Sequence, residues 1–201
     1  MPESAAEVYA RVVAAVGEDG RLPVPDTSEW DIFPWAVDDG ALVTRPLMAP
    51  GEETARGGEG GRDCLSCAAV HGAIWENDAW RVKHLKPSGL PIVLVLETKD
   101  HLDYAQLDDE QAAAYGLLSV RLARIIESLP NIARCHVSRW GDGSSHFHVW
   151  FFGRIEGLLA TRGSFAVDWD DILPPGPEDV WRADLAAVAH KLANHDGTSL
   201  V

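Results

Sequence analysis

Two histidines separated by one residue stand in the apolar segment Ser144–Phe152, which reads SSHFHVWFF. Alternate residues of a β-strand lie on one face, so we expect His146, His148 and Trp150 to share a face while the residues between them enter a core. Imidazoles on one face can hold a metal ion, or one of them can act as a nucleophile or general base. A pair of polar residues on a solvated face is the alternative.

A second candidate for chemistry is the pair Cys64 and Cys67, in the sequence Cys-Leu-Ser-Cys. This spacing lets two thiolates bind one zinc ion, and a closed tetrahedral site then needs two further ligands. His71, His101 and His146 are the candidates for those positions. Two reduced cysteines in a core, or a redox pair, are the alternatives.

The charge balance excludes several classes of partner. The 201 residues include 17 Lys and Arg against 31 Asp and Glu, which gives a formal net charge of −14. Nucleic-acid-binding proteins carry a basic excess, so we expect no nucleic-acid partner. No segment approaches the roughly 18 consecutive apolar residues of a membrane helix, and residues 1–20 lack the basic start of a secretory signal. Three cysteines are too few for a disulfide scaffold, so we expect a reducing, cytoplasmic location.

The elements that would position these residues are helices around a block of strands. Ser4 and Glu7 form a capping-box pattern before a first helix, and Asp108 begins a second helix, over residues 108–129. Apolar runs predict strands over residues 80–85, 91–96, 135–138 and 146–152, and a last helix over residues 178–194. Because strands and helices do not alternate regularly, we predict an α+β fold with an antiparallel sheet of about five strands.

The same pattern divides the chain into three parts. Residues 1–63 are predicted to form a helix and an irregular extension, in which residues 49–63 are rich in Gly and Glu and typical of an exposed connection. Residues 64–154 are predicted to form the central domain. Residues 155–201 are predicted to form a C-terminal loop and helix that pack on that domain.

Taken together, residues 64–154 resemble the histidine triad superfamily of nucleotide hydrolases and transferases. The resemblance is carried by the Cys-x-x-Cys pair, two antiparallel strands, a Lys-x-His sequence ending at His101, a capped helix and the His-x-His strand. It implies a histidine triad-like sheet with a central helix, and His148 as the nucleophile that attacks the α-phosphate of a nucleotide. The resemblance further implies a structural zinc ion whose four ligands are Cys64, Cys67, His101 and His146.

Two departures from the family pattern fall at the nucleophile strand. Trp150 stands where the family has its third histidine, and an indole offers one N–H donor and no proton acceptor. The family pattern Gly-Gln-Ser-φ-x-His, in which φ is apolar, reads Gly141-Asp-Gly-Ser-Ser-His146 here. Ser144 or Ser145 is therefore the candidate to bind phosphate, and Trp150 is a further candidate substrate-binding residue.

The resemblance also implies where a ligand and a second copy of the chain would bind. The base and ribose of a nucleotide would lie against the first strand of the pair, facing Val82 or His84, with Lys86 nearby. A homodimer would form through the central helix and an edge strand. We expect either an enzyme, a nucleotide phosphoramidase, hydrolase or nucleotidyltransferase with a covalent intermediate on His148, or a degenerate binding module that keeps the zinc ion without turnover. A zinc-stabilised protein of unrelated fold is the third possibility.

Overall fold

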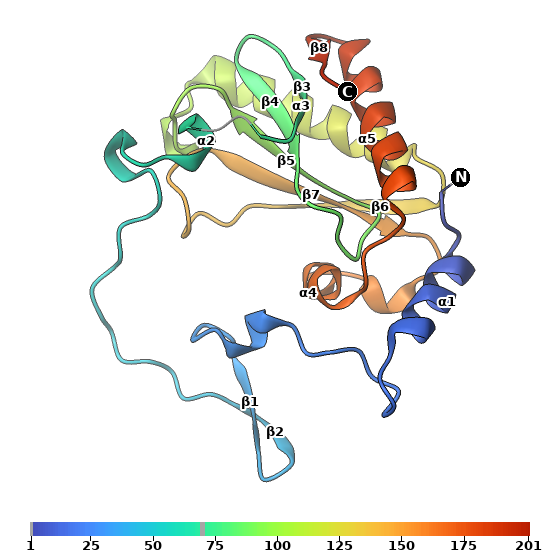
Figure 1. The fold of residues 1–201 in the computed structure, drawn as a ribbon. Coiled ribbons are helices and arrows are strands. Elements are labelled where there is room, and N and C mark those ends of the chain that lie inside the picture. Colours follow the sequence, from blue (N-terminus) through green and yellow to red (C-terminus); the bar gives the residue numbers. More distant parts are fainter. Residues whose placement is uncertain (1, 69–70) are drawn as a thin grey trace.

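The centre of the molecule is one antiparallel sheet of six strands in the order β6-β7-β5-β4-β3-β8. The computed structural model describes residues 2–68 and 71–201 (Figure 1). The strands are β3 (Ala73–Glu76), β4 (Trp80–His84), β5 (Ile92–Thr98), β6 (Ile132–Ser138), β7 (His148–Ile155) and β8 (Thr198–Ser199). All seven residues of β5 are buried, as expected of the apolar run that predicted a central strand.

Two helices, α3 (Asp109–Glu127) and α5 (Glu178–Ala193), cover one face of this sheet (Figure 1). Asp108 caps the start of α3: its carboxylate accepts the N–H of Gln111, while the Gln111 side chain accepts the N–H of Asp108. This reciprocal capping satisfies two of the N–H groups that a helix start leaves unpaired. The residues Phe147, Val149 and Phe151 point from the β7 segment into the same core, so the predicted alternation of that strand is confirmed.

The opposite face of the sheet carries a shorter helix, α4 (Phe165–Ile172). Ala166 of α4 packs with Val93 of β5 and Phe152 of β7 in a second, smaller apolar cluster. Val93 and Phe152 are paired in the sheet register, so their side chains leave the same face. α4 therefore covers the end of this face that is remote from His148.

The N-terminal part of the chain begins with α1 (Ala5–Ala15), where Ser4 and Glu7 form the predicted capping box. A hairpin of β1 (Trp35–Asp38) and β2 (Ala41–Thr44) follows and lies apart from the large sheet in Figure 1. The remaining short elements are η1 (Asp26–Glu29), η2 (Glu59–Gly61), α2 (Leu65–Ala68), η3 (Tyr104–Gln106) and η4 (Leu159–Thr161). Within the described residues, no helix is both long and apolar enough to cross a membrane.

The predicted α+β fold, with an antiparallel sheet and a long helix on it, is confirmed. The β1–β2 hairpin, β3, α4, β8 and the short elements α2 and η1 to η4 were not predicted. β8 contains two residues, which pair with Trp75 and Glu76 of β3, and two residues carry no periodicity that a sequence pattern could show. They add a sixth strand to the five or so that were expected.

Candidate metal centre and nucleophile

Four side chains from three separate parts of the chain converge at one end of the sheet. Cys64 and Cys67 come from the α2 turn, His101 follows β5, and His146 precedes β7. Their ligand atoms all lie within 4.8 Å of one another. Among the described residues, this cluster leaves out His71, which the spacing argument had also allowed.

The distances within the cluster fit a tetrahedral metal ion. The sulfur atoms of Cys64 and Cys67 lie 3.4 and 3.5 Å from His146 Nδ1, and Cys67 Sγ lies 3.6 Å from His101 Nδ1. A tetrahedral ion with metal–sulfur bonds of about 2.3 Å and metal–nitrogen bonds of about 2.1 Å separates sulfur from nitrogen by about 3.6 Å. Two sulfurs and two nitrogens at these distances can hold one metal ion.

The protonation of His146 also suits a metal ligand. Its ring is 1% exposed, and Nε2 lies 2.8 Å from the carbonyl oxygen of Thr98. A hydrogen on Nε2 that donates to this carbonyl leaves a lone pair on Nδ1, the atom that faces the cysteines. Burial lowers the pKa of His146 and so favours the neutral ring that a metal requires.

The segment from Arg56 to Glu59 fixes the metal cluster to the loop before β7. Gly58 has φ +82°, and a Cβ on it would lie 3.1 Å from Cys64 Cβ and 3.1 Å from His101 Cε1. Gly57 donates its N–H to the carbonyl of Gly143 at 3.0 Å and accepts the N–H of Ser145 at 3.0 Å. Gly57 and Gly58, which were predicted to lie in an exposed connection, are therefore an ordered part of the site.

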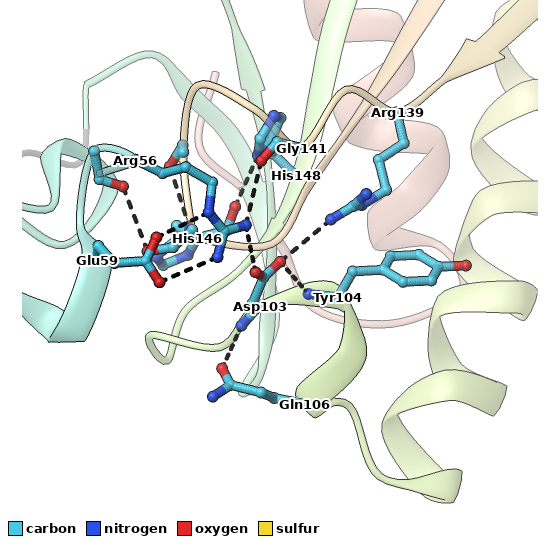
Figure 2. Close-up of polar contacts among 12 residues, drawn as sticks. Arg56, Glu59, Asp103, Tyr104, Gln106, Arg139, Gly141, His146 and His148 are labelled. Carbon is cyan, nitrogen blue, oxygen red and sulfur yellow. Dashed lines mark hydrogen bonds and ion pairs between the residues drawn. The ribbon is translucent and has the colours of Figure 1, made fainter. Parts of the chain in front are cut away.

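Asp103 joins the same segment to the strand connection after β6, as Figure 2 shows. Its carboxylate lies 2.6 Å from Arg56 Nη1 and 3.2 Å from Arg139 Nη2, and Arg56 also donates to the carbonyl of Gly141 at 3.2 Å. Burial alone would raise the pKa of Asp103, but hydrogen bonds from Arg56 and from the N–H of Tyr104 outweigh burial and hold that pKa below its usual value. The carboxylate is therefore charged and forms ion pairs with both Arg56 and Arg139.

His148 is the first residue of β7, and its ring is held by a hydrogen bond to its own strand. Nδ1 lies 2.7 Å from the carbonyl oxygen of His146 (Figure 2). A carbonyl only accepts, so Nδ1 carries the hydrogen and the lone pair of the neutral ring is on Nε2. An imidazole oriented in this way has a free nucleophilic or basic nitrogen.

The neighbours of His148 on its face follow from the register of the sheet. Glu97 of β5 lies directly opposite His148, and Arg81 of β4 lies opposite Glu97. Lys83 follows on the same face of β4 and lies 3.4 Å from Glu97 Oε1. The sequence analysis missed these three residues. The alternation Trp80-Arg-Val-Lys-His84 could have found them, because Trp80 and Val82 are core residues and so assign Arg81 and Lys83 to the other face.

The structure places the remaining candidate residues as follows. Ser145 is 4% exposed and gives its N–H to Gly57, whereas the Ser144 hydroxyl oxygen accepts the N–H of His146 at 3.2 Å. Trp150 follows His148 on the same face and stacks on Phe152, with ring centroids 5.9 Å apart. The structure thus places Trp150 beside His148 on the same face, and both serines form hydrogen bonds within the protein.

His84, the candidate on β4, lies on the helix-covered side of the sheet. Its ring packs edge-on against Trp181 of α5, with centroids 4.9 Å apart. Val82 and Trp80, which share its face, are core residues. His84 is therefore not brought together with His148.

No family model matches this chain, and neither does any curated protein. Solved structures do. A Zn-bound histidine triad family protein from Mycobacterium smegmatis is 18% identical with a TM-score of 0.49, over 66% of this chain and 97% of that chain. A histidine triad protein from Marinobacter aquaeolei VT8 is 18% identical with a TM-score of 0.49, over 63% of this chain and 96% of that chain.

The chain resembles histidine triad proteins. The same comparison finds a Plasmodium falciparum diadenosine triphosphate hydrolase, 16% identical with a TM-score of 0.43, over 62% of this chain and 79% of that chain. At these TM-scores the likeness lends no weight to a function. The function proposed for this chain rests on its own side chains.

Proposed function

We propose that this protein binds a nucleotide and transfers its nucleotidyl group, by attack at the α-phosphorus, through a covalent intermediate on His148. The observation that carries the proposal is the hydrogen bond from His148 Nδ1 to the carbonyl of His146, at 2.7 Å. This hydrogen bond leaves the lone pair on Nε2 free and fixes the orientation of the ring. The segment before the strand that carries His148 contains His146, which belongs to the metal cluster. A nucleophile that is fixed in tautomer and orientation avoids reorganisation when it reacts.

The transfer has two steps. His148 Nε2 attacks the α-phosphorus, so a phosphorus–nitrogen bond forms while the bond to the leaving group breaks, and the bonding electron pair departs with that group. Nδ1 keeps its hydrogen and its bond to the His146 carbonyl. Water or another acceptor then attacks phosphorus, the phosphorus–nitrogen bond breaks with its electron pair returning to Nε2, and the acceptor loses a proton to solvent.

We also propose that the metal is zinc and that its role is structural. Two cysteines and two histidines in tetrahedral reach of one another are a ligand set that zinc prefers, and four protein ligands leave no position for a substrate. A zinc ion bound there would fix the start of β7 through His146. It would thereby hold the backbone carbonyl that orients His148.

The proposal is tested by intact-mass spectrometry after brief incubation with adenosine 5′-phosphorimidazolide, an activated nucleoside monophosphate. We expect an adenylyl adduct on the wild-type protein, none on His148→Ala, and an unchanged adduct on His190→Ala, the matched control, because His190 lies on the exposed side of α5. An adduct that survives in His148→Ala would falsify the nucleophile assignment.

A binding module without turnover is the second candidate function, and two observations favour it. Trp150 cannot accept a proton, and the Ser145 N–H is already bound to Gly57 rather than free for phosphate. Nucleotide binding by the wild-type protein, with neither adduct nor product on any activated nucleotide, would support this candidate over the enzyme.

A homodimer through α3 and β6 remains part of the proposal. β6 is an outer strand of the sheet, and Leu117, Val120 and Val137 expose apolar surface on α3 and β6. An outer strand with exposed apolar side chains is a surface that pairing with a second copy would bury. Light scattering at micromolar concentration should give twice the mass of the chain, and the mass of a single chain would exclude the dimer.

A further inference from the structure

A row of charged residues lies beside His148 where an apolar surface would be needed to bind a nucleobase. Arg81, Glu97 and His148 lie opposite one another on three adjacent strands, β4, β5 and β7. Paired residues of an antiparallel sheet project from the same face, with strands about 4.8 Å apart. Lys83 lies on this face two residues after Arg81.

The charges in this row are buried and closely paired. The Glu97 carboxylate lies 3.3 Å from Arg81 Nε and 3.4 Å from Lys83 Nζ, and it accepts a hydrogen bond from Ser66 at 3.0 Å. The side chains of Glu97 and Arg81 are 2% and 5% exposed, whereas that of Lys83 is 16% exposed. Solvent therefore reaches the group through Lys83.

Two cations face one carboxylate here, so the group carries a net charge of +1 within a chain whose formal charge is −14. A divalent metal on two thiolates adds no net charge beside it. Within the part of the chain that is described, Arg81 Nη1 has no hydrogen-bond acceptor, and Arg81 Nε faces Glu97 Oε1 at 3.3 Å as an ion pair without a hydrogen bond. The Lys83 ammonium has three donors and one carboxylate partner. Burying a positive charge that has no partner costs folding free energy, and an anion bound to the free donors would offset that cost.

We propose that Arg81, Glu97 and Lys83 form an anion subsite beside His148, which binds a phosphate group of the ligand. Lys83 contacts the anion because it is the member that solvent reaches. Arg81 supplies the surplus charge, and Glu97 positions both cations through the distances given above. The inference rests on the proposed function for the identity of the anion as a nucleotide phosphate. On this proposal, the surface of β5 and β4 next to His148 binds a charged phosphate group and not a planar base.

Titration calorimetry tests the subsite on the metal-loaded protein, with adenosine 5′-monophosphate as the anionic ligand and adenosine as its uncharged counterpart. We expect the wild-type protein to prefer the monophosphate, and Lys83→Met to lose about 10-fold in affinity for the monophosphate but none for adenosine. Lys83→Arg retains the charge and should recover most of the affinity. Lys99→Met removes one positive charge at a partly exposed pair with Glu76 and is the matched control.

The outcomes separate this subsite from the proposed function. Equal binding of the monophosphate by the wild type and Lys83→Met overturns the subsite, and so does a wild type that shows no phosphate-dependent binding. Neither result affects an adenylyl adduct on His148, which is measured separately. Loss of affinity in Lys83→Met together with no adduct on the wild type would keep the subsite and reject nucleotidyl transfer.

Discussion

The metal end of the sheet and the face around His148 meet at two residues, His146 and His148, yet they differ in how they are built. At the metal end, the four residues that sequence analysis grouped lie together at distances suited to one ion. On the face around His148, only Trp150 among the remaining candidate ligand-binding residues lies beside that histidine. Charged residues that were not anticipated make up the rest of the row.

The difference teaches what kind of information each region needs. A metal site demands particular residue types within a fixed distance, and few histidines and cysteines in the chain can satisfy that demand. The character of a sheet face depends instead on register, and a shift of one residue moves a strand's side chains to the other face. The residues around a nucleophile are therefore the less predictable of the two.

The largest expected effect tests the metal end. Cys64→Ser removes one of the four ligands, so we expect metal content to fall from about one zinc ion per chain to near zero. Because metal binding is coupled to folding, the free energy of unfolding should fall by about 4 kcal/mol or more. Elemental analysis and urea unfolding of protein purified without added metal measure both quantities.

Cys135→Ser is the matched control for this experiment. Cys135 lies in β6, where burial raises the pKa of its thiol to about 12, and it takes no part in the metal cluster. The Cys135→Ser variant should therefore keep its zinc ion. Full zinc content in Cys64→Ser, or a metal-free wild type of undiminished stability, would contradict the assignment of the metal end.

The second effect tests the charged row beside His148. Glu97→Leu leaves Arg81 buried without its carboxylate, and a buried charge that has lost its partner costs about 3 kcal/mol of folding stability. The double variant Arg81→Met with Glu97→Leu should recover most of the loss, because the only charge then left without its partner is that of Lys83, which solvent reaches. Urea unfolding of the metal-loaded variants measures these differences.

Glu76→Leu serves as the control, since Glu76 is about one-third exposed and pairs with Lys99 at 3.5 Å. Its loss should cost no more than about 1 kcal/mol. A double variant as unstable as Glu97→Leu would mean that the stability of this face does not depend on charge pairing.

The helices and central strands could be predicted because their signals are local. The capping pairs Ser4 with Glu7 and Asp108 with Gln111 mark helix starts within four residues, and both are found as predicted. Residues 92–96 of β5 are all apolar because both faces of the strand are buried. Local patterns of this kind are independent of the rest of the chain.

Outside the metal cluster, contacts between distant segments were not predicted. Gly57 and Gly58 lie in a stretch whose Gly and Glu content is typical of a loose connection, yet they touch Ser145, Cys64 and His101. His84 was placed near the ligand, but its strand turns it toward Trp181 of a helix 97 residues later in the chain. The alternation of β4 places His84 on the same face as the core residues Trp80 and Val82, but the sequence of β4 does not show that α5 covers this face.

The smallest expected effect concerns Asp184, a buried carboxylate without cationic side-chain partners like those of Glu97 among the described residues. We expect that burial without such a partner changes the sign of a carboxylate's contribution to the free energy of unfolding. Asp184 of α5 is 6% exposed, and burial raises its pKa from 3.8 to about 6. The folded protein therefore binds the Asp184 proton more tightly than the unfolded chain does. Stability must then fall as the pH rises from about 4 to about 6, and the loss is complete above that range.

Asp184→Asn should remove this pH dependence and stabilise the protein by about 2 kcal/mol at pH 8, with no gain near pH 4. Glu97→Leu is expected to destabilise at pH 8, so two buried carboxylates in one molecule should respond with opposite signs. Asp179→Asn, exposed in the first turn of the same helix, is the control and should change stability by less than about 1 kcal/mol. Urea unfolding at pH 4, 6 and 8 decides the matter. If Asp184→Asn is no more stable than the wild type at pH 8, pairing is not what distinguishes Glu97 from an ordinary buried acid.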